Sequence, residues 1–309
     1  MVRTIAAVVG LAAAAVAGVA AAPAPDVRPA ITGISHLAVY STDAAASEHF
    51  YAALLGARKG ADPENAVGAR YYFSPRQFVE VLPAPADHGP SMLAHAAFTT
   101  VDAPALRAWM GRHGIQGLSP LQRDANGERW FSSRDPEGNE VQFVQPASAD
   151  TTPEAKAISG RIIHLGYLVR DRAREDSFFR QVLGFRPYWF GAKQPGAVDW
   201  VSQQVPDARD WLEYMMVGPG STVPGERVDA RQLGVLNHLS LGVPNMEAAV
   251  TRLIADDRLS PRHDGPQMGL DGKWQANLYD PDGTRVELME FGPTTKPCCS
   301  PFTAESPAG

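Results

Sequence analysis

The chain repeats one pattern four times, and this repeat limits the folds open to it more than any other feature. Each copy opens with a short apolar segment that contains one histidine, and a residue type that caps helices follows seven positions later. The histidines are His36, His95, His164 and His238, and the capping residues are Asp43, Asp102, Asp171 and Asn245. We therefore expect each copy to begin with a strand that carries one inward polar side chain and to continue with a helix.

Each copy ends in a strand that offers an oxygen able to bind a metal. Glu80, Gln142, Glu213 and Glu287 lie 44, 47, 49 and 49 residues after the histidine of their own copy. The turns DPEG at 135–138 and DPDG at 280–283 favour a hairpin before this strand, because proline fixes φ and glycine accepts a positive φ. The sequence therefore predicts an α+β chain with four units of strand, helix and further strands.

The segments outside the repeats set the predicted boundaries. Residues 1–21 have a positive start, an alanine-rich apolar run and a small-residue cleavage site, which are typical of a signal peptide. We therefore expect export to the periplasm or the extracellular space, without a stable membrane anchor. The polar segment 147–160 predicts a linker between a first domain at 32–146 and a second domain at 161–292. Residues 293–309 predict a flexible tail.

The composition limits the classes of molecule that the protein is expected to bind. The net charge of −6, with acidic and basic residues interspersed, gives no basic face for nucleic acid. We expect a small-molecule partner and a monomer or homodimer. The only cysteines are Cys298 and Cys299 in the tail, so the core must hold the fold without a framework of disulfides. Adjacent cysteines can form a vicinal disulfide, bridge to another chain or bind a soft metal, and we expect two thiols without a catalytic role.

The four units, the DPDG and DPEG hairpins and the spacing of histidine and glutamate together resemble the vicinal oxygen chelate superfamily. This superfamily includes glyoxalase I, extradiol ring-cleaving dioxygenases and the bleomycin and fosfomycin resistance proteins. The resemblance covers about residues 32–292. It implies four βαβββ repeats that form two cup-shaped mixed-sheet domains, each wrapped around a divalent metal whose ligands come from the first and last strands of its units.

The resemblance leaves the pairing of the units open. If neighbouring units pair, the second domain assembles His164, Glu213, His238 and Glu287, and a second, weaker site has His36, Glu80, His95 and Gln142. If unit one pairs with unit four, the sets become His36, Glu80, His238, Glu287 and His95, Gln142, His164, Glu213. The linker favours neighbour pairing. Imidazoles and carboxylates suit Fe, Mn, Ni, Co or Zn, and the sequence does not distinguish these metals.

The reaction depends on whether Glu213 is a ligand. Four ligands indicate a glyoxalase-like lyase or isomerase that acts on a molecule with vicinal oxygens, with Glu213 or Glu287 as base, and this is the leading prediction. Three ligands indicate an extradiol dioxygenase on a catechol or hydroquinone. Extradiol enzymes typically carry a tyrosine and a histidine where this chain has Asn277 and Val223, which weighs against ring cleavage. A third prediction is a non-catalytic binding protein that uses an aromatic cup.

The sequence says less about the side chains that line the predicted cup than about its metal ligands. Trp189, Phe190, Trp200 and Trp211 crowd the third unit, so an aromatic lining is plausible. Arg70 and Lys273 are candidates for contact with an anionic substrate, although single charges on loops are usually solvated. His263 and Tyr279 are candidate proton carriers, although residues of these types near turns usually lie on the surface.

Overall fold

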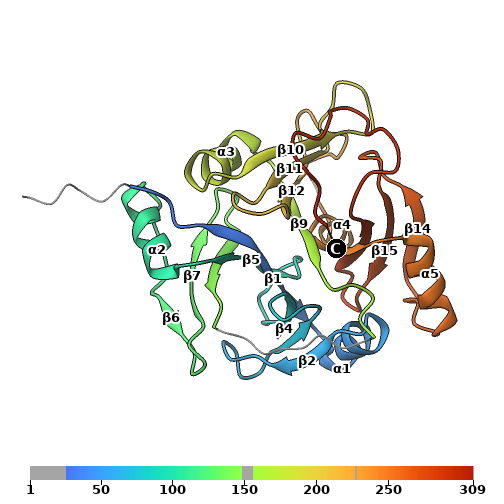
Figure 1. Ribbon diagram of the computed structural model, residues 1–309, viewed down its shortest axis with the longest axis horizontal. Helices are drawn as coiled ribbons and strands as arrows, with labels where there is room; N and C mark the ends of the chain where they lie inside the picture. Colours follow the sequence, from blue (N-terminus) through green and yellow to red (C-terminus); the bar gives the residue numbers. More distant parts are fainter. Residues whose placement is uncertain (1–25, 148–155, 227, 309) are drawn as a thin grey trace, which may run out of the picture.

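The structure is a computed structural model, and it describes residues 26–147, 156–226 and 228–308. Two eight-stranded mixed sheets lie side by side, with β1 of the first sheet next to β9 of the second (Figure 1). The predicted signal peptide at 1–21 and most of the predicted linker, 148–155, lie outside the described residues. No helix in the described ranges has the length and apolar character needed to cross a membrane.

The first sheet contains the strands of repeats one and two. In order across the sheet they are β2 (Arg58–Ala61), β3 (Ala69–Tyr72), β4 (Phe78–Pro83), β1 (Ile31–Ser41), β5 (Leu93–Thr100), β8 (Glu140–Gln145), β7 (Arg129–Arg134) and β6 (Gln122–Arg123). The opening strands β1 and β5 pair antiparallel in the middle. Each is parallel to the last strand of its own repeat on its other side, so the first and last strands of both repeats are adjacent.

The second sheet repeats this plan with repeats three and four. Its order is β10 (Arg186–Gly191), β11 (Trp200–Gln204), β12 (Trp211–Met216), β9 (Ile162–Val169), β13 (His238–Val243), β16 (Arg285–Glu290), β15 (Trp274–Tyr279) and β14 (His263–Met268). The predicted fold class, α+β with βαβββ repeats in two cup-shaped mixed sheets, is confirmed. Neighbouring repeats share a sheet, so the alternative ligand sets from a pairing of units one and four do not form.

Each repeat has a helix after its opening strand. The helices are α1 (Ala44–Glu48) continued by η1 (His49–Leu54), α2 (Ala103–Arg112), α3 (Arg172–Asp176) continued by η2 (Ser177–Val182), and α5 (Met246–Ala255). The four predicted capping side chains all accept hydrogen bonds from backbone N–H groups of the first turn, which satisfies donors that the helix leaves free. One helix that the repeat did not predict, α4 (Ala230–Leu236), precedes β13.

One apolar core runs through both sheets. Phe98 of β5 packs against Phe179 and Phe185 of the second sheet's side, with ring centroids 6.4 and 5.2 Å away. Gln77 joins the sheets by polar contacts, because its Nε2 donates to the Ile162 carbonyl (2.9 Å) and its Oε1 accepts from the Ile162 N–H (3.0 Å). The two domains therefore share a packed and hydrogen-bonded interface.

The two DPxG hairpins also reach across this interface. Tyr51 donates to Asp280 Oδ2 of the DPDG turn (2.9 Å). On the other side, the backbone N–H of Glu137 in the DPEG turn donates to Glu175 Oε1 (3.0 Å). Each hairpin thus contacts the first helical segment of the other domain.

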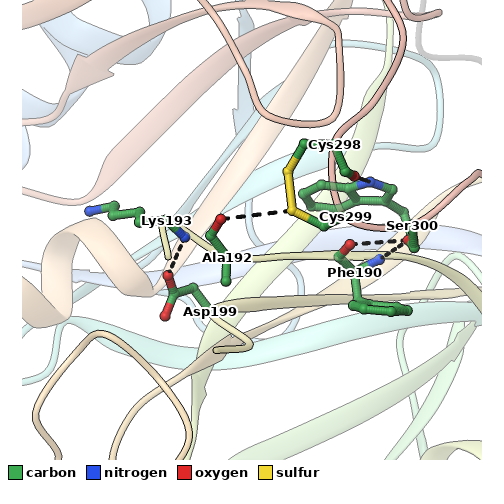
Figure 2. Close-up of a disulfide and its surroundings, with 8 residues drawn as sticks. Phe190, Ala192, Lys193, Asp199, Cys298, Cys299 and Ser300 are labelled. Carbon is green, nitrogen blue, oxygen red and sulfur yellow. Dashed lines mark hydrogen bonds between the residues drawn. A yellow bond between two sulfur atoms is a disulfide. The ribbon is translucent and has the colours of Figure 1, made fainter. Parts of the chain in front are cut away.

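The tail differs from its prediction. Instead of a flexible segment with two thiols, the tail first bonds to the loop at 270–272 and then lies along β10 from Cys298 to Thr303, and Cys298 and Cys299 form a vicinal disulfide (Figure 2). Ser300 Oγ accepts from the Phe190 N–H (2.9 Å), and Trp189 Nε1 donates to the Cys298 carbonyl (3.2 Å). These contacts are available because β10 is an edge strand, whose outer backbone groups have no partner strand. The sequence of the tail does not show that it lies next to this edge.

Candidate metal centres

The second sheet brings two histidines and a glutamate together. His164 on β9 and His238 on β13 face each other with their Nε2 atoms 3.0 Å apart, and Glu287 Oε2 on β16 lies 3.2 Å from His164 Nε2. All three side chains are buried, and their ligand atoms lie within 4.8 Å of one another. This arrangement fits the three protein ligands of a divalent metal.

Strand register explains why these residues meet. His164, Ser240 and Glu287 stand opposite one another on β9, β13 and β16. Glu213, Gly166 and His238 form the adjacent row on β12, β9 and β13. On each strand, the residues of these two rows are two positions apart, so their side chains point to the same face of the sheet. Both rows therefore point into the same cup.

Gly166 makes room for one ligand. A Cβ atom at this position would lie 2.0 Å from His238 Cε1, closer than nonbonded atoms approach. His238 Nδ1 lies 2.9 Å from the Leu236 carbonyl, which can only accept, so Nδ1 carries the proton and the lone pair of Nε2 faces His164. Glycine and carbonyl together orient the His238 ring.

The electrostatics suit metal binding. Burial lowers the pKa of all four repeat histidines, so their imidazoles are neutral at pH 7, the form that binds metals. Burial alone would raise the pKa of Glu287, but its hydrogen bond with His164 and the charge of Arg285 lower it below its ordinary value. Glu287 is therefore an ionised carboxylate beside two neutral imidazoles.

Glu213 lies at the edge of this cluster. Its Oε2 is 3.7 Å from His238 Nε2, and its Oε1 is 3.4 Å from Ser202 Oγ. Burial and the nearby charge of Glu287 raise the pKa of Glu213 to about 8. Glu213 thus stands apart from the three closest residues, in a position to be either a fourth ligand or a proton carrier.

A cavity of about 810 Å³ reaches this cluster at Glu287. Glu213 and Glu287 both line it, and its walls combine aromatic and apolar side chains with a similar number of polar and charged ones. The aromatic lining comprises Tyr188, Trp189, Trp200, Trp211 and Phe302 of the tail. Asn277 and Val223, which stand where extradiol enzymes have a tyrosine and a histidine, line the cavity. The candidate proton carriers do not: His263 is exposed, and Tyr279 donates to Asp264 (2.8 Å). The cavity is large enough for a small organic molecule.

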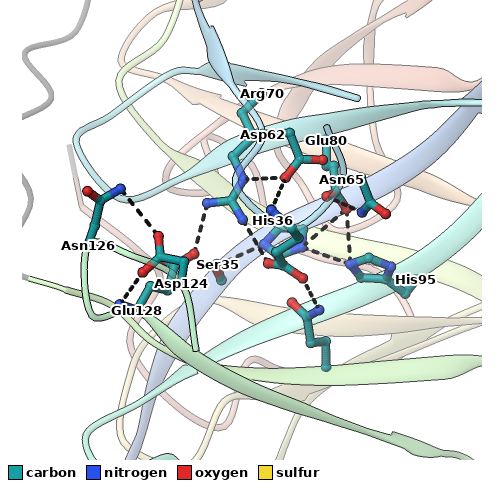
Figure 3. Close-up of polar contacts among 12 residues, drawn as sticks. Ser35, His36, Asp62, Asn65, Arg70, Glu80, His95, Asp124, Asn126 and Glu128 are labelled. Carbon is teal, nitrogen blue, oxygen red and sulfur yellow. Dashed lines mark hydrogen bonds and ion pairs between the residues drawn. The ribbon is translucent and has the colours of Figure 1, made fainter. Parts of the chain in front are cut away.

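The first sheet contains a related cluster. His36 on β1 and His95 on β5 have their Nε2 atoms 2.9 Å apart, and Glu80 Oε2 on β4 lies 3.3 Å from His95 Nε2 (Figure 3). Burial and the neighbouring Asp62 raise the pKa of Glu80 to about 9. Gln142, the predicted fourth member, is turned aside, because its Nε2 donates to Glu64 Oε2 (2.8 Å).

Arg70 fills the cup of the first sheet. It is 2% exposed on β3, and its guanidinium pairs with Glu64 (2.7 Å), Glu128 (2.9 Å) and Asp62 (3.4 Å). The guanidinium also lies over the Phe78 ring, 4.4 Å from its centroid. The sequence suggested a solvated loop charge here; the acidic partners that bury it lie in loops 6 to 58 residues away, without a repeating pattern to identify them.

Lys273 is buried as well. Its Nζ lies over the Trp211 ring, 4.3 Å from the centroid, and the side chain is 0% exposed. Trp211 in turn packs against His164, with ring centroids 4.6 Å apart. Lys273 is therefore part of the packing behind the second cluster.

A comparison with known families identifies the first domain. Residues 33–143 match the Glyoxalase/Bleomycin resistance protein/Dioxygenase superfamily. These residues belong to that superfamily. The resemblance inferred from the repeat and its hairpins is therefore confirmed, and the first domain is a glyoxalase-superfamily domain with a His36, Glu80 and His95 cluster. No curated protein sequence matches the chain.

Solved structures resemble both domains together. A complex of homoprotocatechuate 2,3-dioxygenase from Brevibacterium fuscum with 3,4-dihydroxyphenylacetate has 17% identity and a TM-score of 0.62 over 86% of this chain and 82% of that one. The 2,3-dioxygenase LapB from Pseudomonas sp. KL28 has 17% identity and a TM-score of 0.63 over 88% and 97%. Homoprotocatechuate 2,3-dioxygenase from Arthrobacter globiformis has 16% identity and a TM-score of 0.62 over 87% and 84%. At such identity, the likeness concerns the fold.

Proposed function

We propose that the second domain binds one divalent metal ion through His164, His238 and Glu287, and that the protein is an enzyme. Its substrate is a small molecule whose two adjacent oxygens bind that metal. The observation that carries the proposal is the position of the cluster: three buried ligand atoms lie within 4.8 Å of one another, and one of them, from Glu287, belongs to a residue that lines a cavity of about 810 Å³ with five aromatic side chains in its walls. When bound, such a metal acts as a Lewis acid on the two oxygens and, if it is iron or manganese, as the partner of dioxygen.

Ring cleavage of a catechol by dioxygen is the reaction that a three-residue cluster favours. Two histidines and one carboxylate leave positions on the metal for both a chelating substrate and dioxygen. The fold likeness to homoprotocatechuate 2,3-dioxygenase, whose complex contains 3,4-dihydroxyphenylacetate, supports this choice. The aromatic walls would hold the substrate ring, and Glu213, which faces both His238 and the cavity, would exchange the substrate proton.

A metal-dependent lyase or isomerase is the second candidate. The observation that favours it is Glu213, because a carboxylate 3.7 Å from His238 Nε2 needs only a small shift to become a fourth ligand. It would then act as the base that moves a proton between carbons next to the two oxygens. Asn277 and Val223, which cannot carry a proton in place of the tyrosine and histidine of extradiol enzymes, also fit this reaction.

Oxygen uptake separates the two candidates. Purified protein loaded with Fe(II) or Mn(II) would be mixed with a panel of catechols in an oxygen electrode, and with 2-oxoaldehyde adducts and 2-hydroxy ketones under nitrogen. Oxygen uptake with a ring-opened product supports the dioxygenase. Turnover under nitrogen with Zn(II), Ni(II) or Co(II) supports the lyase or isomerase. Tight aromatic ligand binding that survives chelation, without turnover, would replace both with a binding protein.

Export is also part of the proposal, and it rests on residues 1–21 alone. Cell fractionation with sequencing of the mature amino terminus tests it. A mature protein that begins near Ala22 outside the cytoplasm is the expected result, and an intact Met1 in the cytoplasm would contradict it.

A further inference from the structure

We propose that the substrate is an organic acid whose carboxylate binds Arg285, a proposal that rests on the proposed function and narrows its substrate class. Arg285 lies on β16, two residues before Glu287, and both residues line the cavity of about 810 Å³. A carboxylate bound by Arg285 would fix the orientation of the substrate relative to the metal. It would also distinguish an acid from a neutral molecule of the same shape.

Strand register directs Arg285 into the second cup. It stands opposite His238 and extends the row that Glu213, Gly166 and His238 form across the sheet. Residues two positions apart on one strand point to the same face, so Arg285 and Glu287 share the face of the metal cluster. Two positions span roughly 7 Å along a strand, so the guanidinium and the metal can bind opposite ends of one small molecule.

The guanidinium of Arg285 has no protein partner in the described part of the chain. Its side chain forms no ion pair or hydrogen bond there, and its buried Nε has no acceptor. On the neighbouring strand β15 it stands opposite Tyr279, whose hydroxyl already donates to Asp264 (2.8 Å). An arginine keeps its charge and has five N–H donors, so a partly buried one favours an anionic acceptor.

The repeat does not require an unmatched arginine at this position. In the first sheet the equivalent residue is Glu140 on β8, which pairs with the second histidine strand β5 in the same way. Arg134 on β7 stands opposite Glu140, so the first sheet has opposite charges on these two strands. The second sheet has Tyr279 opposite Arg285 instead.

Two of the five carboxyl groups that line the cavity are used by backbone donors. Asp199 accepts hydrogen bonds from the N–H groups of Lys193 (2.8 Å) and Thr222 (2.6 Å). Asp229 caps α4 and accepts from the Gln232 N–H (2.8 Å). These contacts explain both carboxylates without Arg285.

The other three carboxyl groups also have their own roles. Asp271 accepts from the Lys273 N–H (3.1 Å) and lies close enough to the Lys273 ammonium for the two charges to interact. Glu213 stands at the far end of the row, three strands from Arg285. Glu287 belongs to the metal cluster. None of the three forms an ion pair with Arg285 in the described residues.

The charge of Arg285 therefore fits one negative charge on the substrate. The other two basic residues that line the cavity, Lys193 and Arg231, are exposed, so water can solvate them. A guanidinium forms two parallel hydrogen bonds with a carboxylate. One unmatched positive charge also favours a carboxylate over a phosphate, which carries up to two negative charges at pH 7.

The experiment measures how the full chain, loaded with Zn(II), binds 3,4-dihydroxybenzoate and its methyl ester in a calorimeter under nitrogen. Both probes have two adjacent oxygens, and only the acid has a carboxylate. We expect the wild type to bind the acid about 10-fold to 100-fold more tightly than the ester. Arg285→Gln should lose this preference and keep its affinity for the ester, which shows that the fold and the metal site are intact. Arg285→Lys should fall between them, because an ammonium keeps the charge without the fork.

Arg262→Gln is the matched control. Arg262 is exposed and lies over the Tyr279 ring, 3.9 Å from its centroid, so this change removes a positive charge near Arg285 from a residue that does not line the cavity. It should keep the wild-type preference for the acid.

Two outcomes separate this proposal from the proposed function. An equal preference for the acid in Arg285→Gln and the wild type, or a wild type without that preference, would overturn the role of Arg285, even if the ester binds only when metal is present. If Arg285→Gln loses the preference but both probes bind equally well without metal, the carboxylate site is supported and the proposed function fails.

Discussion

Arg70 and Ser202 occupy equivalent positions in the two sheets, and they differ in what they leave open. Arg70 on β3 stands opposite Glu80 on β4, and Ser202 on β11 stands opposite Glu213 on β12. The arginine fills the first cup with a buried guanidinium, whereas the small serine side chain lines the cavity of the second. One position in the repeat thus separates a closed cluster from an accessible one.

Ser202→Arg should close the second site. The new side chain would enter the cavity beside Glu213 and displace the substrate. Because a displacement of about 1 Å can slow a reaction by about 100-fold, we expect turnover to fall by about that factor or more. Metal content should remain that of the wild type, because no ligand changes. Ser202→Ala is the control and should keep most activity. An active Ser202→Arg enzyme would show that substrate does not use this cavity.

Gly166→Ala should damage the metal site without removing a ligand. The added Cβ would overlap His238 Cε1 at 2.0 Å, so the imidazole must move away from His164. We expect the affinity of the second domain for metal to fall by about 10-fold to 100-fold, measured by competition with a chromophoric chelator. Ala38 is the equivalent residue of the first sheet, and Ala38→Gly should leave metal binding nearly unchanged. Unchanged affinity in Gly166→Ala would argue against His238 as a ligand.

The sequence was informative where strand periodicity carries the signal. The histidines, the capping residues and the carboxylates recur at nearly constant spacing, so their meeting in one cup could be inferred from the repeat. It was uninformative where contacts depend on loops. Arg70 and Lys273 are buried by partners without a repeating pattern, and the tail binds the free edge of β10. Gln142 is turned aside by Glu64, a loop residue 78 positions away.

Gln77→Ala should weaken the contact between the domains. The change leaves the N–H and carbonyl groups of Ile162 without their partner, which costs about 1–3 kcal/mol of unfolding free energy. Urea denaturation followed by fluorescence measures the loss, and the exposed Gln116→Ala is the control. If Gln77→Ala and Gln116→Ala unfold at the same urea concentration, the Gln77 bridge does not contribute to stability.

Asp280 should make stability depend on pH. Burial raises its pKa from 3.8 to about 7, although hydrogen bonds from the Thr284 N–H and Tyr51 partly oppose this. Between these values the folded protein keeps a proton that the unfolded chain has lost, so the contribution of Asp280 to stability falls as the pH rises from about 4 to about 7.

Asp280→Asn mimics the protonated form at every pH. Relative to the wild type, this variant should gain unfolding free energy across that interval, by up to about 4 kcal/mol. Denaturation at a series of pH values measures the difference, and the exposed Asp87→Asn should follow the wild type. A difference between Asp280→Asn and wild type that stays constant with pH would mean that Asp280 is ionised in the folded protein.

The most direct test of the account is the metal content of the mature protein, purified without chelators or a metal-binding tag, beside His238→Ala and the exposed His263→Ala. We predict that the wild type and His263→Ala contain a divalent metal that His238→Ala has lost, since removal of one ligand leaves an incomplete shell. Equal metal content in His238→Ala and the wild type would contradict it, and so would a wild type that binds no metal after reconstitution.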